Sequence, residues 1–412
     1  MSKEEGKKSE IIVKSNSRDL LAFMKLVPNR KKLIEKASSE PIKTDPMNEL
    51  ANRLHPRRQY LVITEIRDET KSAKTFKLEP HVGLRTKELA YFRPGQYLSL
   101  KVKVNGVEIT RPYSIASSPK DAQEGFYEIT IRKEEHGFLT QYLWDNWKVD
   151  TIVESSGPEG FFYYEPLRDL TQMVGIAGGS GITPFRSMAK AIIEGIIDAK
   201  LTILYGSSEE DDIIYFEEFK KLEKQCSDKL KVINVLSCEV VSLDGCETGF
   251  ITAEIIEKYC DVNNSTFFIC GPQVMYEFVE KELEKFKIPY KRIRREAFGE
   301  IKNIVDCPGF PKEVAEKTFK IKTHIGKITK EIPAIATESV LVAMERANLA
   351  PPSKCRSGEC GFCRSLLISG DIYISSISDW RRAADKKFNY FHPCYSFPVS
   401  DLEIKVPRQI KK

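Results

Sequence analysis

The stretch Cys355-Arg-Ser-Gly-Glu-Cys360-Gly-Phe-Cys363 places three cysteines close together, and Cys394 follows after thirty further residues. This C-x4-C-x2-C spacing with a distant fourth cysteine is typical of a [2Fe-2S] cluster held by four thiolates. Structural zinc sites usually take their ligands as two close pairs, so zinc is the minor alternative. Gly358 and Gly361 lie where a tight loop around two irons needs unusual backbone angles. The predicted metal ligands are Cys355, Cys360, Cys363 and Cys394.

These cysteines and their spacing resemble the ferredoxin domain of plant-type [2Fe-2S] proteins, which has an α+β fold of the β-grasp type. The resemblance implies such a domain over residues 316–412. The expected elements are a hairpin of Thr318–Thr323 and Lys327–Ile332, a helix over Glu338–Leu349, and strands over Ser365–Ile374 and Asp401–Val406. Residues 299–315 are rich in turn-forming residues and are predicted to be a linker.

The composition indicates a globular protein with several cores. A chain of 412 residues is long enough for about three domains. Its hydrophobic content of 41% and charged content of 30% exclude a fibre and a disordered chain. No apolar run reaches the roughly twenty residues of a membrane span, and residues 1–8 form no apolar leader. We therefore expect a cytoplasmic protein whose ten cysteines are thiols or ligands rather than disulfides.

The basic charge of the chain is concentrated at its N-terminus. The formal net charge is +5, and residues 1–60 alone carry fourteen Lys and Arg against eight Asp and Glu. Residues 1–56 are predicted to be a basic extension with one amphipathic helix, Ser17–Lys36, whose apolar stripe is broken at Pro28. Because this extension has no interleaved aromatic residues and carries many acids, we expect a solvated helix that packs on the body or on a partner, and no nucleic-acid binding.

Residues 57–166 are predicted to form an antiparallel β-barrel, because short alternating runs are separated by turn residues. The expected strands are Tyr60–Ile66, Ala73–Leu78, Gln96–Val102, Glu108–Ile115 and Tyr127–Arg132. The fourth strand contains Arg111-Pro112-Tyr113-Ser114, which could hold a flat, charged ligand through a phosphate contact, a stacked ring and a hydroxyl. Gly137-Phe138-Leu139-Thr140 opens a helix whose free N–H groups can receive a pyrophosphate.

Residues 167–298 alternate between strands and helices, so they predict an α/β domain with a parallel sheet. Its first strand runs into a turn with Gly178, Gly179 and Gly181, followed by Thr183 as the helix N-cap and Pro184 as the first helical residue. This turn places bare N–H groups at a helix start, where a nucleotide phosphate binds well. The last expected strand ends at Cys270-Gly271-Pro272, at the edge of the sheet where ligands of such domains bind.

Taken in order, these motifs resemble the ferredoxin-NADP reductase-like flavoproteins. Together with the C-terminal ferredoxin domain, the layout is similar to that of the one-chain reductases of the phthalate dioxygenase, phenylacetyl-CoA oxygenase and hybrid-cluster-protein types. The resemblance implies FAD, with FMN as the alternative, a [2Fe-2S] cluster, and NADH, with NADPH as the alternative. It also implies a redox partner protein that accepts single electrons.

The resemblance further implies roles for individual residues. Ser114, Cys270 and Glu296 would be the catalytic residues; a solvated ion pair of Glu296 with Arg294 or Arg295 is the alternative. The implied cofactor-binding residues are Arg111, Pro112, Tyr113, Ser114, Gly137, Phe138, Leu139, Thr140, Gly178, Gly179, Gly181, Thr183, Pro184, Ser207, Cys270, Gly271 and Pro272.

The chain departs from many relatives after Tyr205-Gly206-Ser207, where they carry an arginine that can pair with a ribose or a 2′-phosphate. Here the next residues are Ser208 and then four acids, residues 209–212. Four free carboxylates would repel a 2′-phosphate, whereas Ser207 can serve a ribose hydroxyl. The sequence therefore favours NADH.

The sequence hypothesis is an NADH-dependent iron-sulfur flavoprotein reductase that feeds a partner redox protein, such as an oxygenase or another metalloenzyme. A nicotinamide gives up two electrons together, whereas a [2Fe-2S] cluster accepts one, so a flavin must stand between them. The alternative is an NAD(P)H reductase that acts on a small soluble acceptor at the flavin. Which protein accepts the electrons is not encoded in any motif of this sequence.

Overall fold

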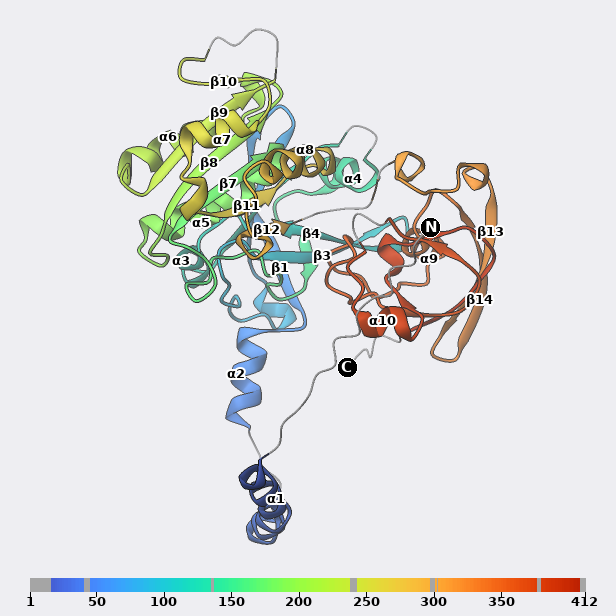
Figure 1. The fold of residues 1–412 in the computed structure, drawn as a ribbon. Helices are drawn as coiled ribbons and strands as arrows, with labels where there is room; N and C mark the ends of the chain where they lie inside the picture. The colour runs from blue at the N-terminus through green and yellow to red at the C-terminus, as the bar shows by residue number, and fades with distance from the viewer. Residues whose placement is uncertain are drawn as a thin grey trace. The chain divides into compact units, whose positions relative to one another are not determined.

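The computed structural model describes residues 16–40, 45–134, 137–237, 243–296, 301, 303–375 and 379–407. The chain forms two units, Met1–Leu50 and Ala51–Lys412. The second unit contains three successive domains, which Figure 1 colours from blue through green and yellow to red along the chain.

The first unit contains α1 (Ser17–Lys36), whose bounds are those predicted. Asn16 caps this helix by accepting hydrogen bonds from the N–H groups of Arg18 at 2.7 Å and Asp19 at 3.3 Å. Pro28 lies inside α1 and does not break it. Neither α1 nor the following helix α2 (Pro46–Leu54) has a buried residue in the described structure, and the packing of this extension on a partner stays a prediction. None of the described helices has the length and apolar content needed to cross a bilayer.

The second unit begins with the predicted antiparallel barrel. Its sheet has the strand order β4-β3-β6-β1-β2-β5, and a bridge between Ile115 and Ile129 joins the two edges. The strands are β1 (Gln59–Thr70), β2 (Ala73–Pro80), β3 (Tyr97–Val104), β4 (Val107–Ser114), β5 (Tyr127–Arg132) and β6 (Ile152–Ser155). The sequence did not reveal β6, which is only four residues long. Two short helices, α3 (Pro119–Gln123) and α4 (Phe138–Asn146), accompany the barrel.

The second domain is the predicted parallel sheet, in the order β10-β9-β8-β7-β11-β12. Its strands are β7 (Gln172–Gly178), β8 (Lys200–Ser207), β9 (Leu230–Leu236), β10 (Glu247–Thr248), β11 (Thr266–Cys270) and β12 (Ile293–Glu296). Its helices are α5 (Thr183–Ile193), α6 (Phe216–Gln225), α7 (Ala253–Tyr259) and α8 (Gln273–Glu284). Residues of α5 and α6 share one hydrophobic core with the sheet, and residues of α7 and α8 share another. The strand that ends at Cys270 is not the last one, because β12 pairs beside it.

The C-terminal domain has the mixed sheet β14-β13-β19-β15-β17, in which β13 and β19 run parallel. Its main elements are β13 (Thr318–Ile325), β14 (Ile328–Ile335), α9 (Val340–Arg346), β15 (Ser365–Ser369) and β19 (Leu402–Val406). Shorter elements are β16 (Ile372–Tyr373), α10 (Ala383–Lys387), β17 (Tyr390–Phe391) and β18 (Phe397–Pro398). The order of these elements is the one expected of a β-grasp domain.

The segment predicted as a linker, residues 299–315, belongs to the C-terminal core wherever it is described. Ile304, Phe310 and Val314 are buried with the residues of this domain. The Phe310 ring packs edge-on against Tyr373, whose hydroxyl donates to the Pro308 carbonyl at 2.8 Å. Turn residues therefore mark a segment that is irregular but tightly packed.

Candidate functional site

The four predicted metal ligands come together in the C-terminal domain. Cys355, Cys363 and Cys394 are buried, whereas Cys360 is exposed. The Sγ atoms of Cys363 and Cys394 are 3.4 Å apart. The Cys360 N–H donates to Cys355 Sγ at 3.4 Å, and the Phe362 N–H donates to Cys360 Sγ at 3.5 Å.

This arrangement fits a cluster with two irons better than a zinc ion. The cysteines form two pairs in space, Cys355 with Cys360 and Cys363 with Cys394, as two irons that share four thiolates require. Gly358 and Gly361 have φ values of +82° and +66°, so the loop uses the left-handed conformations expected of its glycines.

The barrel presents the predicted flavin residues at the end of β4. Tyr113 packs against the barrel core, and burial raises its pKa to about 12 although the Arg111 charge opposes this rise. The backbone of Ser114 pairs with Tyr97 on β3. The Ser114 hydroxyl is buried and has no hydrogen-bond partner among the described residues. Because a buried polar atom without a partner costs free energy, this hydroxyl fits a ligand atom that is bound at the end of β4.

The predicted pyrophosphate turn lies at the start of α4. This helix begins at Phe138, and its N-cap residue is Gly137, which has no side chain to cap the helix. Thr140 Oγ1 accepts a hydrogen bond from the Glu134 N–H at 3.1 Å, which ties Glu134 to the first turn of the helix. Leu139 is buried in the barrel core, so only part of this motif is available to a ligand.

The two nucleotide motifs of the α/β domain contact each other. A Cβ atom on Gly181 would lie 2.0 Å from the Cys270 carbonyl oxygen, and one on Gly271 would lie 3.2 Å from the Gly178 backbone nitrogen. The prediction that Thr183 is an N-cap is wrong: it is the first residue of α5, and its hydroxyl donates to the Ser180 carbonyl at 2.9 Å. A 3₁₀ turn over Gly179–Ile182 already has helical geometry, so the helix has no extended N-cap residue.

Glu296 lies beside Cys270, because the two residues are register partners on β12 and β11. The carboxyl is buried, and its Oε2 atom has no hydrogen-bond partner among the described residues. The alternative of an ion pair with a neighbouring arginine is wrong, since Arg294 pairs with Asp169 and Arg295 pairs with Glu280. Two buried oxygens, on Ser114 and Glu296, thus lie near each other at this edge of the domain, and neither bonds any other described residue.

The environment raises the pKa of both groups at this edge. Burial raises the pKa of Glu296 well above its usual value, the Glu359 charge raises it further, and the nearby Ser114 hydroxyl opposes the rise. Burial, together with the Glu296 charge, likewise raises the pKa of the Cys270 thiol well above its usual value. A protonated carboxyl can donate a hydrogen bond to a ring nitrogen or carbonyl, which a carboxylate cannot do.

Replacement of Glu296 by glutamine is expected to stabilise the protein increasingly as the pH rises. The unfolded carboxyl ionises above about pH 4.3, whereas the raised native pKa means that the folded carboxyl keeps its proton to a higher pH, so the wild type loses about 1.4 kcal/mol per pH unit between the two pKa values. The Glu296→Gln variant carries no such loss. Thermal unfolding of both proteins between about pH 5 and pH 8 measures the difference in their unfolding free energy.

The control for this experiment is Glu128→Gln, for which the opposite sign is expected. Glu128 is also buried, but the charges of Arg186 and Arg67 outweigh burial and hold its pKa below the usual value. Its stabilisation is present above the unfolded pKa and is lost on acidification, so the variant loses stability at neutral pH. A stability difference for Glu296→Gln that does not change with pH would contradict the assignment of a neutral native carboxyl.

The four acids that follow β8 are engaged and do not form a free negative patch. Glu209 and Asp211 pair with Lys71 at 2.5 and 3.2 Å. Asp212 is buried, pairs with Arg132, and accepts hydrogen bonds from the hydroxyls of residues 70 and 72 at 2.6 Å each. The predicted repulsion of a 2′-phosphate stays a prediction, although two cations offset part of the negative charge. Glu209, Asp211 and Asp212 join the α/β domain to the barrel.

Arg132, on β5 of the barrel, is a candidate site residue that the sequence did not reveal. Its Nη1 atom lies 2.6 Å from the position that a Cβ atom on Gly179 would take. The guanidinium thus reaches the glycine turn of the other domain. No local signal points to this residue, because Arg132 precedes its partner Asp212 by eighty positions.

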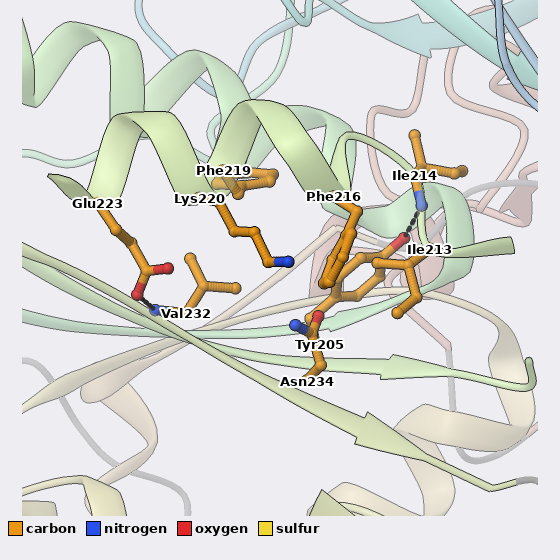
Figure 2. A pocket seen from close by; sticks show the side chains of 9 residues that line it. All are labelled: Tyr205, Ile213, Ile214, Phe216, Phe219, Lys220, Glu223, Val232 and Asn234. Atoms are coloured by element: carbon orange, nitrogen blue, oxygen red, sulfur yellow. Dashed lines mark hydrogen bonds between the residues drawn. The ribbon is translucent and has the colours of Figure 1, made fainter. Parts of the chain in front are cut away.

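A shallow pocket lies between α6 and the strands β8 and β9 (Figure 2). Figure 2 shows the Tyr205 hydroxyl at the Ile214 N–H and the Glu223 carboxylate at the Val232 N–H. Lys220 lies 3.9 Å above the Phe216 ring. The pocket contains none of the predicted site residues, and its polar groups bind neighbouring protein atoms, so it is a packing feature of this domain.

Three family models match the chain in the order of its domains. They are "Oxidoreductase FAD-binding domain" over residues 61–164, "Oxidoreductase NAD-binding domain" over residues 176–281, and "2Fe-2S iron-sulfur cluster binding domain" over residues 323–399. The chain is 31% identical to NADH-cytochrome b5 reductase 1 of Meyerozyma guilliermondii over 48% of this chain and 69% of that protein. The chain belongs to the ferredoxin reductase-type flavoproteins.

Other members of this family match more than three quarters of the chain. The ferredoxin reductase component of 3-ketosteroid-9-alpha-monooxygenase from Mycobacterium tuberculosis H37Rv is 27% identical over 83% of this chain and 93% of its own. One of the subunits of 1,2-phenylacetyl-CoA epoxidase from Escherichia coli is 25% identical over 77% of this chain and 88% of its own. The structure of phthalate dioxygenase reductase has the same fold, with a TM-score of 0.60 and 21% identity over 88% of this chain and all of that one.

Membership of this reductase family confirms the predicted fold and chemistry. The chain is an NAD(P)H-dependent oxidoreductase with FAD-binding, NAD-binding and [2Fe-2S] domains, and it passes electrons from NAD(P)H through the flavin to the cluster. When bound, FAD accepts two electrons at once and releases them singly. The described residues fit these groups, because the cysteines form two pairs and the buried oxygens of Ser114 and Glu296, which bond no other described residue, lie at the ends of β4 and β12.

Proposed function

We propose that this chain is the NADH-dependent reductase component of a redox system and that its cluster delivers single electrons to a partner metalloprotein. One observation carries the proposal: the flavin strand and the cluster loop meet around Tyr97. This buried tyrosine pairs with Ser114 on one side, and on the other its backbone pairs with Glu159, whose carboxylate binds Lys354 next to Cys355. Cys360 is the exposed ligand, so the electron would leave the cluster there.

In this proposal the residues of the barrel and the α/β domain hold the two organic cofactors. Arg111 and the turn Gly137–Thr140 would bind flavin phosphates, Tyr113 would flank the flavin ring, and Ser114 would donate to it. Neutral Glu296 and the Cys270 thiol would line the place where the nicotinamide meets the flavin. The remaining predicted residues, Pro112, Gly178, Gly179, Gly181, Thr183, Pro184, Ser207, Gly271 and Pro272, would shape the nucleotide site.

The names of the relatives support an oxygenase as the partner. Two of them are reductase components of a ketosteroid monooxygenase and of a glycine betaine monooxygenase, so electron delivery to an oxygenase recurs among similar proteins. A cytoplasmic location is part of the proposal, and the nine described cysteines, all without disulfides, support it.

A preference for NADH is expected because the nearby cations are already occupied. Lys71 and Arg132 are both held by carboxylates, so neither is available to a 2′-phosphate. We expect kcat/KM to be at least about tenfold higher with NADH than with NADPH. Ser208 is exposed directly after β8, and Ser208→Arg should lower the KM for NADPH, whereas the control Ser208→Ala should not. Equal use of both nucleotides by the wild type would contradict this preference.

The proposed function is tested by spectroscopy of the purified protein. The visible spectrum should show flavin and cluster absorption, and anaerobic NADH should bleach both. Chemical analysis should find two irons and two acid-labile sulfides for each flavin, as a [2Fe-2S] flavoprotein requires. A protein that lacks flavin or iron after aerobic and anaerobic purification would overturn the proposal.

A further inference from the structure

Lys354 and Arg356 flank the first cluster ligand, Cys355, and both bind partners beyond the cluster loop. Lys354 Nζ pairs with Glu159 Oε1, which lies 195 positions earlier in the barrel domain. Arg356 is buried, and its Nη1 atom bonds Glu345 Oε1 on α9 at 2.5 Å and the Thr110 carbonyl on β4 at 3.5 Å. The two residues that flank Cys355 in the sequence are therefore both fixed by partners outside the cluster loop.

Glu159 is itself tied to the flavin strands by its backbone. The Tyr97 N–H donates to the Glu159 carbonyl at 2.9 Å, and the Glu159 N–H donates to the Tyr97 carbonyl at 2.9 Å. Tyr97 on β3 in turn pairs with Ser114 on β4. A short connected path thus leads from Ser114 through Tyr97 and Glu159 to Lys354, which is bonded covalently to Cys355.

The surroundings of this ion pair differ from those of an ordinary surface pair, because both side chains are partly buried and the ammonium has a second contact. The side chains of Lys354 and Glu159 are 28% and 21% exposed. Lys354 Nζ also lies 4.2 Å above the ring of Phe362, which belongs to the cluster loop. Partial desolvation and a second favourable contact for the ammonium both strengthen such a pair. A second ion pair between the flavin barrel and the cluster domain, Arg111 with Glu345, is longer, at 3.9 Å.

We propose that the Glu159–Lys354 ion pair holds the [2Fe-2S] domain against the flavin barrel in the position for internal electron transfer. Glu159 and Lys354 are positioning residues in this scheme, because neither is a cluster ligand nor one of the flavin-binding residues. The inference rests on the proposed function. NADH supplies the electrons, and the cluster accepts one of them at a time.

Charge reversal of each partner, singly and together, tests this inference. In stopped-flow experiments with the holoenzyme and anaerobic NADH, Glu159→Lys and Lys354→Glu should each slow cluster reduction at least about tenfold, because like charges then face each other. The rate of flavin reduction should not change. The double variant, Glu159→Lys with Lys354→Glu, should regain the wild-type rate. The control is Lys101→Glu, because Lys101 pairs with Glu108 and Glu154 inside the barrel and should not affect cluster reduction.

A second measurement does not depend on activity. In the oxidised holoenzyme without NADH, backbone amide hydrogen exchange at Tyr97 and Glu159 should be faster in each single variant and normal in the double variant. The inference is wrong if the single variants show the wild-type rates of amide hydrogen exchange and of cluster reduction. It is also wrong if the double variant regains neither rate. A loss of iron from the single variants that the double variant does not restore also overturns it. If NADH reduces neither the flavin nor the cluster of the wild type, the proposed function is wrong. The hydrogen-exchange data then still test the ion pair.

Discussion

Replacement of Cys360 by serine is expected to abolish electron delivery to proteins and to spare electron delivery from the flavin. Cys360 is the exposed one of the four predicted ligands, so its loss should open the cluster with little cost to the packing of the domain. NADH-dependent reduction of cytochrome c, used as a one-electron protein acceptor, should fall at least about a hundredfold. NADH-dependent reduction of ferricyanide should persist, because this small acceptor can take electrons from the flavin. Both rates are measured by absorbance in steady state.

The matched control for this prediction is Cys307→Ser. Cys307 lies in the same domain and is half-buried, but it is no cluster ligand. The control should retain the iron, the cytochrome c activity and the ferricyanide activity. If Cys360→Ser loses its iron and still reduces cytochrome c at the wild-type rate, electrons leave from the flavin. The alternative function, reduction of a small soluble acceptor at the flavin, would then describe this chain better.

Replacement of Gly181 by alanine is expected to abolish hydride acceptance from NADH. The added Cβ atom would lie 2.0 Å from the Cys270 carbonyl oxygen, 2.5 Å from its carbon and 2.8 Å from the Gly271 nitrogen. All three atoms belong to the backbone, so the glycine turn and the end of β11 must move apart. Misplacement of a reacting group by about 1 Å can cost a hundredfold in rate, so NADH-driven flavin reduction should fall by about that factor. Stopped-flow absorbance measures this rate.

The matched control is Gly206→Ala, in the neighbouring strand β8. A Cβ atom on Gly206 would meet the Ala177 carbonyl oxygen at 3.6 Å, which is ordinary van der Waals contact. This variant should keep its thermal stability, whereas Gly181→Ala should lose about 1–3 kcal/mol of unfolding free energy. The [2Fe-2S] absorption should stay intact in both proteins, because the cluster domain has its own core. Wild-type flavin reduction in Gly181→Ala would show that the contact of the two turns does not position the nicotinamide.

Local patterns predicted most of the architecture. The predicted and observed bounds of α1 agree, because its apolar spacing and its Asn16 cap are local features. The barrel strands, the parallel sheet and the hairpin of β13 and β14 followed from periodicity and turn residues. The strand β12 was missed because its sequence, Ile-Arg-Arg-Glu, is too short and too charged to be recognised as a strand. It forms at the edge of the sheet, where charged side chains can reach solvent or pair.

The sequence by itself determined the chemistry of the cluster centre. The spacing of Cys355, Cys360 and Cys363 sets a loop of fixed length, and a loop of that length with two left-handed glycines can place its sulfurs in only a few ways. Such information is local, so it can be read without knowledge of the fold. The same holds for the glycine turn that opens α5.

Only the tertiary structure decided the partners of the charged residues. Three of the four acids after β8, Glu209, Asp211 and Asp212, bind the barrel, and Glu296 is buried beside Cys270 instead of pairing with an arginine. Lys354 likewise finds Glu159 at a distance of 195 positions. A charge acts through its surroundings in space, and burial, dielectric and the nearest counter-charge are all set by contacts between distant segments. The spacing of residues along the chain therefore does not reveal these contacts between distant segments.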